Sequence, residues 1–108
     1  MEKIVSKGIV QSYFSKLQDN LEVDCAIVGG GPSGLVAGTI LAKQGYRVII
    51  LERHLSPGGG MWGGAMLFNS IVVQNEAVPV LQEFGVDYTR SDDSCVVTDS
   101  VHSTAALI

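Results

Sequence analysis

The sequence predicts an α/β fold of the Rossmann-like, FAD/NAD-binding type, which is incomplete at the C-terminal end. Residues 23–28 and 47–52 are short, mostly apolar segments, and residues 32–44 between them suit a helix. Together they have the length of one strand–helix–strand unit, and the sequence GGGPSG joins the first strand to the helix. Both strand segments are apolar at nearly every position, as is typical of parallel strands covered on both faces.

Composition limits the class of protein. The chain has 108 residues, which leaves room for one domain at most, and 46% of them are hydrophobic, enough for a packed core. The net charge of −4 provides no basic surface for nucleic acid or an anionic membrane. The longest aliphatic run, residues 48–51, is too short to cross a bilayer. Two cysteines without metal or disulfide spacing indicate a cytoplasmic protein.

The other elements follow from periodicity and helix stop signals. Within one domain, 1–108, we expect a helix over 6–19, the strand–helix–strand unit over 23–52, a glycine-rich loop over 57–65 and a remainder over 66–108. Gly45 ends the helix of the unit as a left-handed residue. The remainder is expected to contain a helix over 76–84, a strand over 95–98 and a final helix, capped by Asp99 or Ser100, that runs to Ile108. Because too few strands precede the end for a complete doubly wound sheet, we expect a longer parent protein.

The first glycine loop predicts dinucleotide binding. Gly29, Gly31 and Gly34 have the spacing G-x-G-x-x-G between a strand and a helix. Gly29 would make the tight turn, Gly31 would leave the backbone open to a pyrophosphate, and Gly34 would allow close packing of helix on strand. Glu52 ends the second strand, where a carboxylate accepts hydrogen bonds from ribose hydroxyls and favours NAD or FAD over NADP. The adjacent Arg53 weakens that preference. The alternative is an ordinary strand–turn–helix junction.

A second glycine cluster follows directly. Five of the thirteen glycines lie between Gly58 and Gly64. Because glycine loses more backbone entropy on folding than other residues, such a cluster indicates a close approach to the backbone. We expect Gly59 and Gly60 to contact the far half of the dinucleotide. Trp62 either stacks on the ligand or anchors the loop as a buried aromatic residue.

The segment ERHLSPGGGMWGGAMLFNSIVVQ, together with DCAIVGGGPSGLVAG, LQEFGV and TDSVHSTAALI, resembles the thiamine thiazole synthase family, especially its archaeal and bacterial branch. The resemblance covers essentially the whole chain but well under half of a typical member. It implies a flavoprotein-like fold that binds NAD as a substrate. It also implies reaction with glycine and a sulfur donor, assisted by Fe(II), to give an adenylated thiazole carboxylate for thiamine. By motif match, NAD contacts fall on Ser33, Glu52, Arg53 and Gly60.

The resemblance places the catalytic residues and iron ligands downstream of Ile108, so the chain alone is expected to be inactive and to contain no metal site. It implies a homo-oligomer, and the sequence between Gly58 and Gln74 is more similar to the branch that uses sulfide than to the branch that sacrifices a cysteine. Two alternatives remain open: an FAD-dependent oxidoreductase, and a truncated, non-catalytic nucleotide-binding module. Asp92–Asp93 is interpreted as an acidic turn, and His54 and His102 as surface residues.

Overall fold

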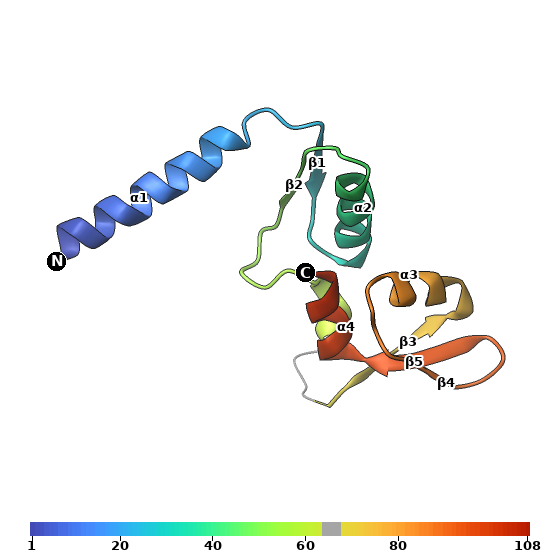
Figure 1. Ribbon diagram of the computed structural model, residues 1–108. Coiled ribbons are helices and arrows are strands. Elements are labelled where there is room, and N and C mark those ends of the chain that lie inside the picture. Colours follow the sequence, from blue (N-terminus) through green and yellow to red (C-terminus); the bar gives the residue numbers. More distant parts are fainter. Residues whose placement is uncertain (64–67) are drawn as a thin grey trace.

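A computed structural model describes residues 1–63 and 68–108 (Figure 1). Two small sheets form the body of the molecule, and a long N-terminal helix, α1 (Glu2–Asp19), projects away from them. The elements that follow α1 are, in chain order, β1 (Cys25–Val28), α2 (Pro32–Lys43), β2 (Val48–Leu51), the 3-10 helix η1 (Gly59–Trp62), β3 (Ser70–Gln74), the 3-10 helix η2 (Asn75–Ala77), α3 (Val78–Glu83), β4 (Thr89–Arg90), β5 (Cys95–Asp99) and α4 (Ser100–Leu107). The end of the predicted glycine-rich loop, residues 64 and 65, lies outside the described residues.

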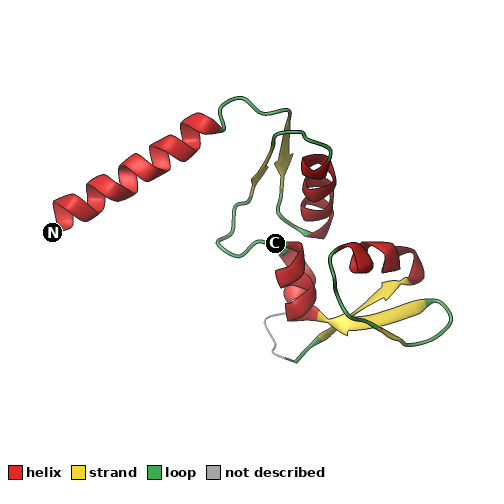
Figure 2. Cartoon of the chain, viewed as in Figure 1, coloured by secondary structure: helices red, strands yellow, loops and turns green. Residues whose placement is uncertain are grey.

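The predicted strand–helix–strand unit is present. β1 and β2 pair in parallel, with Cys25 opposite Val48, and α2 makes the crossover between them (Figure 2). α2 packs closely on this pair because Gly38 has no side chain: a Cβ there would lie 3.1 Å from Ile50 Cδ1. Gly45 has a φ of +91° just after the helix, as predicted for its end. The parallel pair and its helix form the start of a Rossmann-like α/β fold.

Within the described residues, one face of β1 is covered and the other is open. β1 alternates between half-buried and exposed residues, and Val28 is 85% exposed. α2 covers the face on which Ile27 lies, and the described residues leave the opposite face of β1 open.

Sequence reasoning missed a second, antiparallel sheet. β5 lies in its centre, between β3 and β4, and Val73 of β3 is opposite Val96 of β5. Of these three strands, only β5 was predicted, with an end at residue 98 rather than 99. This sheet and α3 enclose the small core of Leu81, Val86 and Val96. Such burial of apolar side chains is the main stabilisation of a unit this small.

The helices of this second unit agree with the predicted pattern except in their details. The segment 76–84 is split into η2 and α3, because Pro79 is tolerated only near the start of an α-helix. α4 starts at Ser100, and Asp99 is its cap: the side chain accepts a hydrogen bond from His102 N at 2.7 Å. Of the two candidate caps, Asp99 is therefore the one used.

α1 differs from prediction at its start. It begins at Glu2 rather than at residue 6, and it ends at Asp19 as predicted. All of its residues are exposed, and Arg47 Nη2 ties its end to the body by donating to Asp19 O. None of the helices in residues 1–63 and 68–108 combines the length and apolar character needed to cross a bilayer.

Candidate functional site

The first glycine loop is built from backbone geometry that the spacing predicted. Gly29 turns the chain with a φ of +102°, and its N–H donates to Leu51 O at 2.8 Å, so the loop continues the pairing of β1 with β2. A Cβ at Gly34 would lie 2.2 Å from Gly29 O, which leaves no room for any side chain. At Gly31, by contrast, a Cβ would meet no atom within 4 Å. The loop is therefore closed behind Gly34 and open at Gly31.

Glu52 is the charged centre of the site. Its Oε2 accepts a hydrogen bond from Gly30 N at 2.6 Å, and its Oε1 accepts one from His54 N at 3.1 Å. These backbone donors, first that of His54 and then that of Gly30, lower the pKa of the Glu52 carboxyl below its ordinary value of 4.5. Glu52 is thus ionised at neutral pH and holds the first loop. Each carboxylate oxygen can accept a further hydrogen bond from a ligand hydroxyl.

The two glycine loops are joined to each other. Gly58 N donates to Gly30 O at 2.6 Å. Gly59 lies against the first loop, since a Cβ there would be 3.3 Å from Gly31 Cα. Gly58 and Gly59 have φ values of +117° and +60°, which glycine adopts at little cost. The dense glycine cluster is thus explained in part by packing of one loop on the other.

Trp62 anchors the second loop. Its Nε1 donates to Pro57 O at 2.8 Å, and the half-buried indole also lies against Gly58, where a Cβ would be 2.8 Å from Nε1. The anchoring role is thus observed, and the same side chain still lines the candidate groove described next. Gly60 is the open position of η1, because a Cβ there would meet nothing within 4 Å.

A wide groove of about 960 Å³ lies between the two loops. Its lining contains five of the residues predicted to bind a dinucleotide: Gly29, Glu52, Arg53, Gly59 and Gly60. The other three predicted residues lie outside the lining: Gly31 beside Gly59, Gly34 buried behind the loop, and Ser33 exposed in the first turn of α2.

Sequence reasoning had not assigned Leu55 and Ser56 to the site and had interpreted His54 as a surface residue. All three line the groove. The available signal was their position in the sequence, between the predicted ribose-binding Glu52 and the second glycine cluster that follows Pro57.

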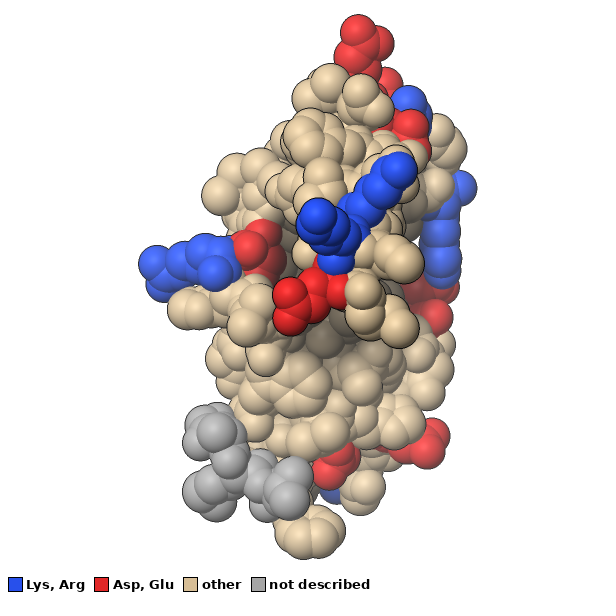
Figure 3. Space-filling view, turned by 90° about the vertical axis from the view of Figure 1, so that its left-hand side faces the viewer, with Lys and Arg blue, Asp and Glu red and all other residues tan. Residues whose placement is uncertain are grey.

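The N-terminus of α2 offers backbone donors beside the first loop. No side chain caps this turn, and Pro32 at its start has no N–H, so Ser33 and Gly34 carry the first helical N–H groups that could meet an anion. Charged side chains of both signs are interspersed on the face in Figure 3, rather than gathered in one basic patch. Arg53 is the cation of the groove lining. Binding of a phosphate here would therefore depend mainly on backbone hydrogen bonds.

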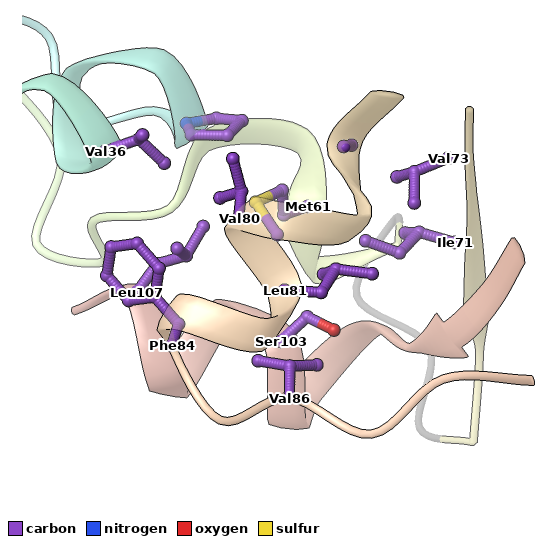
Figure 4. A pocket seen from close by; sticks show the side chains of 12 residues that line it. Val36, Met61, Ile71, Val73, Val80, Leu81, Phe84, Val86, Ser103 and Leu107 are labelled. Carbon is purple, nitrogen blue, oxygen red and sulfur yellow. The ribbon is translucent and has the colours of Figure 1, made fainter. Parts of the chain in front are cut away.

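A second cavity, of about 210 Å³, lies between α2, η1, α3 and α4 (Figure 4). The side chains around it are apolar except for Ser103, whose hydroxyl already donates to Asp99 O at 2.6 Å. Such a cavity has no polar group with which to recognise a nucleotide, so the groove is the candidate site. Across residues 1–63 and 68–108, no three His, Cys, Asp or Glu side chains gather as metal ligands would.

Comparison with known proteins gives a consistent result. A profile of the Thi4 family matches residues 6–108. The thiamine thiazole synthase of Pyrococcus furiosus is 53% identical over 104 residues, which are 96% of this chain and 41% of that protein. That of Thermococcus kodakarensis is 52% identical over 103 residues, 95% of this chain and 41% of that protein.

The crystal structure of Thermovibrio ammonificans THI4 superposes with a TM-score of 0.88 at 52% identity, covering 99% of this chain and 41% of that one. The chain thus spans about two fifths of the length of the relatives that it matches. With nearly all of its residues matched by the profile and about half of them identical in these synthases, the chain belongs to the Thi4 family.

Proposed function

We propose that the chain is the NAD-binding N-terminal part of a thiamine thiazole synthase, with a dinucleotide fold of the FAD/NAD-binding type. The observation that carries this proposal is the junction of the two glycine loops. Gly58 N donates to Gly30 O, Glu52 holds Gly30 N, and between them the backbone is open at Gly31 and Gly60. An elongated ligand with a pyrophosphate in its middle suits such a groove.

In this proposal the residues act by binding and orienting NAD. The backbone at Gly31 and the N-terminus of α2, which includes Ser33, hold the pyrophosphate. The ionised Glu52 accepts hydrogen bonds from the adenosine ribose, and Arg53 lies at the groove to interact with phosphate or ribose oxygens. The open backbone at Gly60 allows the second half of the dinucleotide to pass close to η1.

The proposed reaction of the whole protein is the conversion of NAD, glycine and a sulfur donor to an adenylated thiazole carboxylate. The similarity of residues 58–74 to the sulfide-using branch favours sulfide as the donor. Fe(II) would supply Lewis-acid or redox chemistry when bound, but the described residues offer no ligand set for it. The resemblance to the family implies a homo-oligomer, which we propose for the complete enzyme.

The first experiment identifies what the protein carries. After gentle purification and heat denaturation, the released small molecule is examined by its absorption spectrum and mass. NAD, ADP-ribose or an adenylated thiazole without flavin colour supports the proposal. A yellow supernatant with the mass of FAD instead indicates an FAD-dependent oxidoreductase on the same first loop. Reversible NAD binding without turnover, with glycine, sulfide and iron supplied to the complete protein, indicates a non-catalytic nucleotide-binding module.

Gly60→Val tests the groove itself. The added side chain meets no protein atom within 4 Å of its Cβ, so the fold should persist, but it would occupy space needed by the dinucleotide. NAD binding, measured by calorimetry, should be lost. Gly8→Val is the matched control, because Gly8 also has open space around it and lies in α1, away from the groove. Unchanged NAD affinity in Gly60→Val would rule out this path for the ligand.

A further inference from the structure

We infer that Thr104 is a positioning residue for the nucleotide groove, acting through Gly58 and Trp62 of the second glycine loop. The inference rests on the proposed function, because the groove is the one assigned to NAD. Thr104 lies on α4, far from the loop in sequence, and is 0% exposed. α4 packs directly on η1, and the two lie side by side in Figure 1.

The contact between Thr104 and the loop is a methyl group against a glycine. A Cβ at Gly58 would lie 2.4 Å from Thr104 Cγ2 and 2.8 Å from Trp62 Nε1. The threonine methyl and the indole therefore fill the space beside Gly58 in which a side chain would otherwise stand. Gly58 also donates its N–H to Gly30 O of the first loop. The contact of Gly58 with Thr104 and Trp62 therefore sets the distance between the two loops.

The direction of the methyl group is fixed within α4. Thr104 Oγ1 donates to Ser100 O at 2.6 Å, a bond one helical turn back that selects the side-chain rotamer. α4 is in turn held to the second sheet: Ser100 N donates to Asn69 O at 3.1 Å, and Ser103 Oγ is 3.0 Å from Thr98 Oγ1. The second sheet thus determines where Cγ2 meets the loop.

The remaining residues of the loop agree with this role. Met61 points into the apolar cavity of Figure 4, and Trp62 is bonded to Pro57 O. Gly59, Gly60 and Trp62 line the groove. The loop is thus packed on α4 on one side and borders the groove on the other.

Two substitutions separate the methyl group from the hydroxyl. Thr104→Ser removes Cγ2 and keeps the bond to Ser100 O, whereas Thr104→Val keeps a methyl at that place and removes the bond. Trp62 is the only tryptophan, so its emission and its quenching by acrylamide report on the loop. We expect Thr104→Ser to increase quenching and to weaken NAD binding by about fivefold, the factor given by ~1 kcal/mol. Thr104→Val should behave like the unsubstituted protein in both measurements.

Thr39→Ser is the matched control, because Thr39 of α2 donates its hydroxyl to Leu35 O one turn back at 2.9 Å and loses the same methyl group away from the loop contact. It should leave quenching and NAD affinity unchanged. The inference is overturned if Thr104→Ser leaves either measurement unchanged, if Thr104→Val behaves like Thr104→Ser, or if Thr39→Ser has the same effect. If the unsubstituted protein does not bind NAD, the proposed function is refuted. The quenching comparison still tests the contact between Thr104 and Gly58.

Discussion

Replacing Gly34 with alanine tests the close packing of α2 against the first glycine loop. The new Cβ would lie 2.2 Å from Gly29 O and 3.2 Å from Ile27 Cγ2. The first of these atoms belongs to the backbone, so no side-chain rotation relieves the clash. To reach a separation of even 3.0 Å from Gly29 O, α2 and the first loop must move apart by about 0.8 Å. Such a shift disturbs the packing of the whole helix on the parallel strands.

The expected magnitude follows from two opposing effects. Forcing an extra methyl group into a packed site costs about 3 kcal/mol at the upper end of the usual range, which applies here because backbone must move. Alanine stabilises a helix interior by about 1 kcal/mol relative to glycine, and the gain is at most this at Gly34, in the first turn of α2. The free energy of unfolding should therefore fall by about 2 kcal/mol or more.

Urea unfolding, followed by circular dichroism, measures this change as a lower midpoint at an unchanged slope. Gly8→Ala is the matched control: Gly8 is also helical, but a Cβ there meets nothing within 4 Å, so only the gain in helix propensity applies. A Gly34→Ala protein with the midpoint of the parent would refute the close-packing argument.

Three further predictions concern the loop and the cap. Gly31→Ala should keep the fold, since its Cβ meets nothing within 4 Å, and should lose at most about 1 kcal/mol of stability because alanine is a poorer N-cap of α2 than glycine. It should bind NAD more weakly by calorimetry; undiminished binding would place the pyrophosphate elsewhere. Because the folded-state pKa of Glu52 lies below the ordinary 4.5, its stabilisation is present above that pH and is lost as the pH falls through the folded-state value. The difference in unfolding free energy between the parent and Glu52→Gln should therefore shrink as the pH is lowered, and a difference that stays constant with pH would contradict this. Asp99→Ala should lower stability by about 1 kcal/mol through loss of the α4 cap, whereas Asp99→Asn should retain it; equal midpoints for the two variants would show that the cap contributes nothing.

Local sequence patterns were sufficient to predict the parallel strand pair and its helix. Two apolar segments, a glycine turn and a helical segment ended by Gly45 predicted β1, α2 and β2, because each signal is contained in a few neighbouring residues. The second sheet was missed for the opposite reason. The sequence of β3, SIVVQ, does not alternate between apolar and polar residues, because Val72, which is 63% exposed, is apolar. β4 is two residues long and pairs only with β5 among the described strands. A pairing partner cannot be identified from the short strand itself.

The amino-acid sequence by itself determined the strand–loop–helix–strand unit, the Gly29, Gly31 and Gly34 spacing and the carboxylate at its end, because these depend on backbone sterics and on hydrogen-bonding chemistry within one short segment. Only the tertiary structure decided that Glu52 holds Gly30, that Gly58 is bonded to the first loop, and that Thr104 lies beneath the second. These contacts join segments that meet only when the chain returns on itself. The distances in these contacts are set by the packing of α2 and α4, which cannot be predicted from the periodicity of a short segment.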